Sequence, residues 1–444
     1  MKRDRLRLLL IAPTALDSRG RPIRERRLHL PCLTLPMLAA VTPDYVETTI
    51  IYETVEKIPY DAHWDLVGLT GMGSGIVRAW QIADEFRSRK VPVVIGGIAP
   101  SIGAPEWSLA HCDAVVIGEA DEIWPRVIED FATGRLHPIY RVETSPDLSR
   151  LPVPRYDLMN RWRMGIWRPV QATRGCPHTC SFCSVTTFFH NTFRTRPIDQ
   201  VIRDVKAARR HGSHYIAFID DNLIGDLDYC AQLWEELIPH RIIWMTQCSI
   251  QLADHPELLK LARRSGCRLV SIGIESTDEQ SLQLMGKSWN RPERYPAAIA
   301  AIRNHGIEVS TEMIIGFDSD DISAFDRTLE FVQTNRIAVP RVHILTPIPG
   351  TPLFAKLDES GRIIHRDFGS YTGSKAVFRP SQIDPAEMEK QYWKLYETIF
   401  RWRSIFRRLF PAETSIGPYM KAIVWAANIR YRRHVKARIS PGIL

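Results

Sequence analysis

The chain has 444 residues, which at about 150 residues per domain predicts two to three domains with cores of their own. With 45% hydrophobic and 24% charged residues it is typical of globular proteins, and eight cysteines are too few for a disulfide-stapled secreted scaffold. The apolar run at residues 8–12 ends at Pro13 and is too short for a signal-peptide core. No stretch approaches the roughly 18 apolar residues of a membrane span. We therefore expect a cytoplasmic protein.

The net charge of +8 is a property of the C-terminal tail. Residues 401–444 contain ten Lys and Arg residues against one acid, Glu413, whereas the first 400 residues carry a net charge of −1. A body without excess positive charge does not predict general binding to nucleic acid.

Short apolar runs alternate with helical patterns in the first 145 residues. The runs are rich in Val, Ile and Leu and lack period-2 alternation, as in strands buried on both faces of a parallel sheet. A helical pattern such as residues 75–90 separates them, which predicts a doubly wound α/β sheet with right-handed crossovers. The expected strands are residues 7–13, 47–53, 66–72, 92–98 and 114–120.

Small residues follow three of these strands, at the sheet edge where doubly wound folds bind ligands. No GxGxxG motif with a following acid is present, so we do not expect a nicotinamide dinucleotide. Simple turn chemistry after the strands is the alternative interpretation. The candidate binding residues are Gly71, Gly73, Gly75, Gly96, Gly97, Ser101, Gly118 and Glu119.

A proline-rich segment at residues 145–157 marks the transition to a second series of strands and helices. Helices are expected at residues 197–211 and 255–265, and one long helix at 385–410. Six strands predict a partial (β/α)6 barrel of the TIM type, whose working face lies at the strand C-termini. The expected strands are residues 169–174, 215–219, 242–247, 268–274, 308–315 and 341–346.

The predicted organisation therefore has four parts. Residues 1–145 form the doubly wound domain and residues 146–166 a linker. Residues 167–355 form the barrel, and residues 356–444 a helical C-terminal region with the basic tail.

Three of the eight cysteines, Cys176, Cys180 and Cys183, form a CxxxCxxC motif directly after the first strand of the second series. Random placement of the cysteines would produce this spacing with an expectation of about 0.003, so chance is a poor explanation. Thiolates are ligands of iron–sulfur clusters and of zinc. Zinc usually takes four ligands, with His178 as the candidate fourth. Three cysteines can instead hold a [4Fe–4S] cluster and leave one iron open, and we favour the cluster.

With Phe182 as the aromatic residue before the last cysteine, this motif resembles that of the radical S-adenosylmethionine superfamily. The resemblance implies a [4Fe–4S] cluster on the three cysteines, with S-adenosylmethionine on the open iron. Asp220 and Asp221, which end the second strand, resemble the polar site near the methionine amino group, although many members have Gly-Gly-Glu there. Glu275, after the fourth strand, resembles the acid that binds the ribose hydroxyls. Turn or cap roles are the alternative for these acids.

The doubly wound domain before the cysteine motif narrows the resemblance to radical enzymes that depend on cobalamin (vitamin B12). These include hopanoid methylases, phosphonate methylases and the anaerobic ring cyclase of bacteriochlorophyll synthesis. The resemblance implies that residues 1–145 are a Rossmann-like cobalamin-binding domain. The DxHxxG motif that supplies a histidine to cobalt in many cobalamin proteins is absent, so cobalamin is expected without a protein imidazole on cobalt.

The implied activity is methylation of an unactivated carbon of a small or lipid-like substrate through a 5′-deoxyadenosyl radical, with an external donor of the flavodoxin or ferredoxin type. Cyclisation, oxidation or rearrangement without methyl transfer is the first alternative. A non-catalytic Fe–S or cobalamin sensor is the second.

The basic, aromatic segment at residues 419–439 fits three roles. It can lie on an anionic membrane surface, which would suit a lipid-like substrate and membrane association of the protein. It can equally pack on its own barrel. RNA binding is the least expected role, because the tail contains no recognised RNA module.

Overall fold

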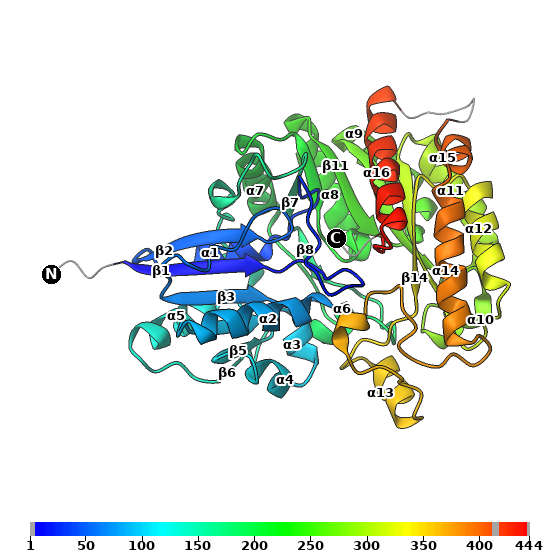
Figure 1. Ribbon diagram of the computed structural model, residues 1–444. Coiled ribbons are helices and arrows are strands. Elements are labelled where there is room, and N and C mark those ends of the chain that lie inside the picture. The colour runs from blue at the N-terminus through cyan, green and yellow to red at the C-terminus, as the bar shows by residue number, and fades with distance from the viewer. Residues whose placement is uncertain (1–4, 411–416, 442–444) are drawn as a thin grey trace.

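The computed structural model describes residues 5–410 and 417–441, and two six-stranded parallel sheets follow one another in the chain (Figure 1). The first sheet has the order β2-β1-β3-β4-β5-β6. It confirms all five strands expected there and adds β6, whose three residues were too few to predict. Its strands are β1 (Leu6–Ala12), β2 (Val46–Tyr52), β3 (Leu66–Thr70), β4 (Val93–Gly96), β5 (Ala114–Ile117) and β6 (Ile139–Arg141).

Helices cover both faces of the first sheet, because its central strand is apolar on both sides. Leu8 and Leu10 of β1 pack into one core with helices α1 and α5, while Leu9 and Ile11 pack into another with α2. The sheet is therefore doubly wound. Its helices are α1 (Thr34–Val41), α2 (Gly75–Ser88), α3 (Ile98–Ile102), α4 (Pro105–Leu109) and α5 (Trp124–Ala132).

The second sheet has the order β7-β10-β11-β12-β13-β14, again with parallel neighbours, so its strands follow the order of the chain. Its strands are β7 (Trp167–Val170), β10 (Tyr215–Phe218), β11 (Ile243–Cys248), β12 (Cys267–Glu275), β13 (Glu308–Ile315) and β14 (Val339–Ile344). Between them lie α7 (Ile198–Arg210), α8 (Leu227–Leu237), α9 (Pro256–Ser265), α10 (Glu279–Leu284), α11 (Tyr295–Asn304) and α12 (Ala324–Thr334). This alternation matches the strands and helices expected from the sequence.

The single strand expected at residues 169–174 is divided in two. β7 belongs to the large sheet, whereas β8 (Thr173–Gly175) pairs with β9 (Phe193–Thr195) in an antiparallel hairpin that carries the cysteine motif and α6 (Ser184–Phe188). The division follows from Asp220, whose carboxylate accepts hydrogen bonds from the backbone N–H groups of Ala172 and Thr173. These donors are therefore lost to the parallel ladder.

The one long helix expected at residues 385–410 is also wrong, because α14 (Pro385–Ile399) ends and α15 (Trp402–Leu409) begins after a two-residue break. The buried Arg408 guanidinium donates to the Ile399 carbonyl, and Arg432 donates to the Phe400 carbonyl. These side chains take over carbonyls that a continuous helix would have used internally.

The tail helix α16 (Pro418–Lys436) packs against α14, α15 and β14, as the alternative of packing on its own barrel requires. Asn428 is fully buried and donates to the Ala338 carbonyl at the start of β14. No helix in the described ranges is both long and apolar enough to cross a membrane. One further helix, α13 (Pro352–Glu359), lies in the chain between β14 and α14.

Candidate active site

The carboxyl ends of both parallel sheets border one cavity of about 640 Å³. In Figure 1 the blue strands of the first sheet run towards the second half of the molecule, so their final loops meet it. The lining comes from the loops after β1 and β3, the cysteine loop and the ends of β11 to β14. This volume lies in the usual range for sites that bind small molecules and cofactors.

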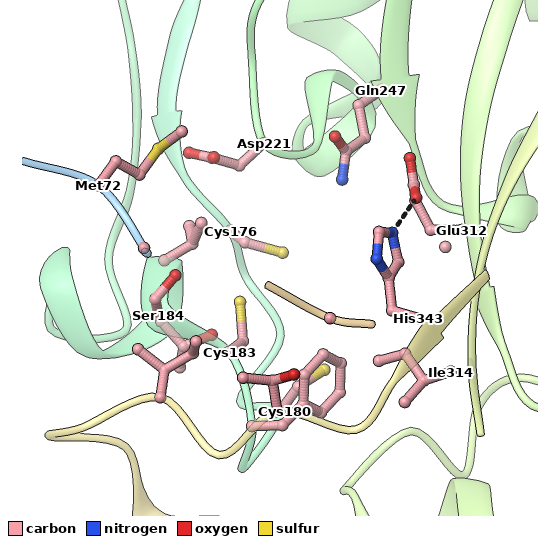
Figure 2. A pocket seen from close by; sticks show the side chains of 18 of the residues that line it. Met72, Cys176, Cys180, Cys183, Ser184, Asp221, Gln247, Glu312, Ile314 and His343 are labelled. Carbon is pink, nitrogen blue, oxygen red and sulfur yellow. Dashed lines mark hydrogen bonds and ion pairs between the residues drawn. The ribbon is translucent and has the colours of Figure 1, made fainter. Parts of the chain in front are cut away.

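The three motif cysteines all line this cavity. Figure 2 shows the sulfurs of Cys176, Cys180 and Cys183 turned towards the same space, with Met72 on one side and Glu312 and His343 on another. The loop that carries them leaves β8 at Gly175, and Leu353 at the start of α13 donates its N–H to the Ser181 carbonyl over 3.0 Å. A hydrogen bond to a distant helix thus helps to hold a loop that has little regular structure of its own.

The chemistry of the cysteines fits a multi-iron cluster. Burial raises the pKa of Cys176 and raises that of Cys180 to about 12, and a bound cation would favour the thiolate form of both. Within residues 5–410 and 417–441, no group of three or more His, Cys, Asp and Glu side chains is arranged to hold a single metal ion. A cluster does not need such convergence, because each thiolate binds a different iron. His178 stacks on Trp289 at 4.1 Å between ring centroids, as expected for a loop residue.

Glu275 lies where it was expected, at the end of β12 on the cavity wall. Its backbone has a φ of 62°, which for a residue other than glycine is a costly conformation that turns the side chain out of the strand's alternation. One carboxylate oxygen lies 2.6 Å from the Nζ atom of Lys287, and both side chains are 9% exposed. Lys287 also donates to the Gly273 carbonyl and was not found from the sequence, because a lone lysine after a helix carries no motif.

The two aspartates after β10 have different surroundings. Asp221 lines the cavity and accepts from the Gly175 N–H, while burial and then the neighbouring Asp220 charge raise its pKa to about 7. Asp220 is 2% exposed, and one of its oxygens accepts from Ala172, Thr173 and the Thr173 hydroxyl. Burial raises the pKa of Asp220 to about 6. Asp220 therefore positions the strand that leads into the cysteine loop instead of lining the cavity.

The loop after β3 is the part of the first sheet that faces the cavity most openly. Gly73 and Gly75 line it, and a Cβ added at either would meet no atom within 4 Å. Met72 lies between them and Gly71 and is 71% exposed. A second cavity of about 140 Å³ also has Met72 and Gly73 in its wall. Small residues and one exposed apolar side chain thus leave room for a large ligand.

The other small residues expected to bind a ligand pack against their own loops. A Cβ at Gly71 would lie 2.4 Å from Ile76. Gly97 has a φ of 103°, and a Cβ there would lie 2.7 Å from the Gly71 carbonyl, so only glycine allows this approach. The Ser101 hydroxyl donates to Gly97 and accepts from the Gly118 N–H. A Cβ at Gly96 would lie 3.5 Å from Val116. These contacts fit turn chemistry, and ligand binding by these residues stays a prediction.

Glu119 forms ion pairs with the β8–β9 hairpin. Its carboxylate accepts from Arg174 of β8 at 2.7 Å and from Arg194 of β9. Arg174 pairs in addition with Asp121, whose pKa it holds below the ordinary value against the opposing cost of burial. Acids from the first sheet are thus locked onto the hairpin that carries the cysteines. Glu119 is not part of the lining of the 640 Å³ cavity, and its role in cofactor binding stays a prediction.

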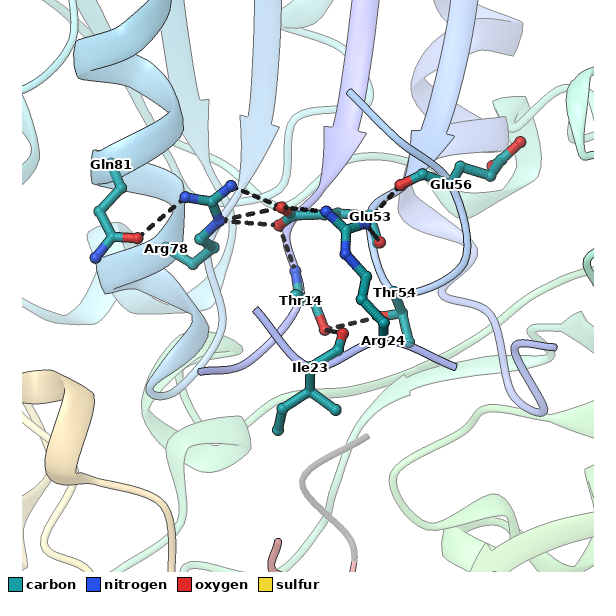
Figure 3. A network of polar contacts seen from close by, with 8 residues as sticks. All are labelled: Thr14, Ile23, Arg24, Glu53, Thr54, Glu56, Arg78 and Gln81. Carbon is teal, nitrogen blue, oxygen red and sulfur yellow. Dashed lines mark hydrogen bonds and ion pairs between the residues drawn. The ribbon is translucent and has the colours of Figure 1, made fainter. Parts of the chain in front are cut away.

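A buried carboxylate just after β2, that of Glu53, holds the loop after β1, which lines the cavity (Figure 3). Glu53 is fully buried and binds the Arg78 guanidinium of α2 at 2.7 Å and the Thr14 N–H at 3.1 Å, and it pairs with Arg24. The chain beside Thr14 contributes Pro13 and Ala15 to the cavity lining. A single acid therefore holds the loop after β1 against α2.

The sequence analysis missed polar side chains that the second sheet contributes to the cavity. Glu312 of β13 accepts from His343 of β14 at 3.2 Å and pairs with Arg341, and Gln247 of β11 lines the same cavity. Burial would raise the pKa of Glu312, but Arg341 and His343 together hold this pKa below its ordinary value. The only available signal was a charged residue inside a run otherwise typical of a buried strand.

Known proteins resemble this chain over most of its length. Residues 170–332 match the family model described as Radical SAM superfamily. The chain is 30% identical over 417 residues to bacteriochlorophyllide d C-12(1)-methyltransferase of Chlorobaculum tepidum, covering 92% of this chain and 90% of the relative. It is 26% identical to the hopanoid C-2 methylase of Rhodopseudomonas palustris, covering 94% of this chain and 79% of the relative.

Among solved structures, the radical S-adenosylmethionine methyltransferase TsrM from Kitasatospora setae, with cobalamin and a [4Fe–4S] cluster bound, has a similar fold. Its TM-score is 0.65 at 15% identity, and the match covers 98% of this chain and 99% of TsrM. The resemblance inferred from the cysteine motif is therefore confirmed: the chain belongs to the radical SAM superfamily, as a relative of its methyltransferases.

Proposed function

We propose that this protein is a cobalamin-dependent radical SAM methyltransferase that methylates an unactivated carbon of a small or lipid-like substrate. The supporting observation is that the three cysteine sulfurs and the open loop after β3 face the same cavity. A doubly wound cobalamin-binding domain, a partial (β/α)6 barrel and a helical C-terminal region are the architecture that we assign to this activity, with the domain boundaries predicted from the sequence.

Each part of the chain has a role in this proposal. Cys176, Cys180 and Cys183 would hold the [4Fe–4S] cluster, and Gly73 and Gly75 leave the space in which cobalamin would lie. When bound, these groups supply electrons for the cleavage of S-adenosylmethionine and the methyl group for transfer. The protein binds and orients the cofactors and the substrate, and it excludes water from the site. An external donor of the flavodoxin or ferredoxin type would reduce the site.

Glu275 and Lys287 would bind S-adenosylmethionine, with the carboxylate accepting from the ribose hydroxyls. Lys287 already holds the Glu275 carboxylate in place, so this side chain loses little further conformational entropy when the ligand binds. Gln247, Glu312 and His343 are placed to hydrogen-bond a polar group of the substrate, since they line the same cavity from adjacent strands. The apolar neighbours Ile314, Ile344 and Ile348 suit the hydrophobic part of such a substrate.

The Glu275→Gln variant should bind S-adenosylmethionine about tenfold or more weakly, because a charge-assisted hydrogen bond contributes roughly 1.5–3 kcal/mol. Iron content and the low-temperature EPR signal should stay unchanged. Equilibrium binding of S-adenosylmethionine to the reconstituted protein measures the effect. Glu279→Gln, at an exposed residue of α10, is the matched control and should bind normally. Unaltered affinity in Glu275→Gln, with only a lower unfolding temperature, would reduce Glu275 to a partner of Lys287.

The function itself is tested with reduced, anaerobically reconstituted protein and methyl-labelled S-adenosylmethionine. A bacteriochlorophyllide and a hopanoid are the first candidate substrates, because relatives act on these compounds. We expect label in the product and cobalamin absorbance that stays with the protein through gel filtration. Deoxyadenosine without label in the product would indicate a radical enzyme without methyl transfer. Neither label nor deoxyadenosine would favour the sensor.

A further inference from the structure

Helix α15 presents a row of large aromatic side chains to solvent. Trp402, Phe406 and Phe410 are 44%, 52% and 48% exposed, and their four-residue spacing places them on one side of the helix. Arg403 and Arg407 are exposed beside them. We call these five residues the α15 surface, and none of them lines the active-site cavity.

The core does not need these aromatic residues. The opposite side of α15 is already buried through Ile405, Arg408 and Leu409. The exposed rings instead gather around Trp425 of α16, with centroid distances of 5.6 Å for Trp402 and 5.0 Å for Phe406. Figure 1 shows α15 and α16 beside each other at the edge of the molecule. A contiguous aromatic patch that contributes little to the core is typical of an interaction surface.

Along the chain, the segment that carries the patch has charge of one sign. The described residues after Glu397 include ten Lys and Arg side chains and no acid. A second copy of this chain would bring the same positive charge against itself across a two-fold interface, which disfavours self-association. An anionic partner is favoured instead.

We propose that the α15 surface docks the protein onto an anionic lipid bilayer. Aromatic rings of this size are enriched at the level of the lipid headgroups, and neighbouring arginines bind the lipid phosphates. The contact differs from the one expected for the tail segment at residues 419–439. In α16 the apolar residues Met420, Val424 and Val435 are buried, so the exposed rings of α15 provide the anchor.

The test is co-sedimentation of the full-length, reconstituted protein with vesicles of phosphatidylcholine alone or mixed with phosphatidylglycerol. The wild type should bind the mixed vesicles and release them at high salt. The double variant Arg403→Glu and Arg407→Glu should bind about tenfold or more weakly, because each basic residue near an anionic surface adds to the electrostatic attraction between protein and membrane. Its rings and buried residues are unchanged, so folding is preserved. The double variant Phe406→Ser and Phe410→Ser should lose binding as well.

Trp162→Ser is the matched control, since Trp162 is 73% exposed and is flanked by Arg161 and Arg163 but lies outside the α15 surface. It should bind like the wild type. Failure of the wild type to bind the mixed vesicles, or equal binding by the variants, would overturn the proposal. So would a wild-type oligomer in light scattering that the variants abolish. The binding measurement needs no substrate, so its outcome is independent of the proposed methyl transfer.

Discussion

Replacement of any one of Cys176, Cys180 and Cys183 by Ala is expected to abolish the cluster that leaves one iron open, and with it the cleavage of S-adenosylmethionine. Each thiolate holds a different iron, so the loss of one cannot be compensated by the other two. Iron content, low-temperature EPR and release of deoxyadenosine under strong reductant measure the effect. This is the largest effect on activity that we expect from a single side chain.

Cys248 provides the control for this experiment. It lines the same cavity at the end of β11 and is 3% exposed, but it lies outside the CxxxCxxC motif. Cys248→Ala should therefore keep its iron and its EPR signal. Motif variants that retain both, or anaerobically purified protein that contains zinc, would contradict the cluster assignment.

Replacement of Arg174 by Met is expected to lower the free energy of unfolding by about 3–5 kcal/mol, because it leaves the Asp121 carboxylate buried without its ion-pair partner and leaves Glu119 with Arg194 alone. The pairs join the first sheet to the hairpin of the cysteine loop, so the hairpin should also lose its fixed position. Urea denaturation of the apoprotein measures the effect as a lower midpoint at unchanged slope. In the wild type, the contribution of Asp121 is present above the ordinary pKa of an aspartate. It is lost as the pH falls through the lowered folded-state pKa.

Arg155→Met is the matched comparison for Arg174. Arg155 forms an ion pair of 2.7 Å with Asp157, but the two side chains are 48% and 54% exposed. Solvent screening reduces such a pair to about 0–1 kcal/mol. Equal midpoint shifts in the two variants would show that the contact between the sheet and the hairpin carries no special weight.

The elements that depend on local pattern were predicted well. Apolar runs identify most strands of both sheets, because burial on both faces favours Val, Ile and Leu. β6 was missed, since only Tyr140 of its three residues is buried. The division of residues 169–174 and the break after Ile399 were also missed. Both depend on hydrogen bonds from groups distant in the chain, Asp220 in the first case and Arg408 and Arg432 in the second.

The same distinction holds for the site: local motifs could be read from the sequence, whereas the surroundings of each residue could not. Cys176, Cys180 and Cys183 lie within eight residues and were found by spacing alone. Glu119 and Asp220 were recognised as strand-end acids, yet only their partners, Arg174 and the backbone of Thr173, show that they position other elements. Lys287 and His343 carry no motif, and become candidates only because folding places them on the cavity wall.

The amino-acid sequence by itself therefore determined the two parallel sheets, the cysteine ligands and the superfamily, because side-chain period and ligand spacing are local properties of the chain. The tertiary structure decided which of the strand-end residues face the cavity and which of the aromatic residues near the C-terminus remain in solvent. Those outcomes depend on contacts between residues far apart in the sequence, such as Glu119 with Arg174 and Trp402 with Trp425. Only packing of the whole chain brings such residues together.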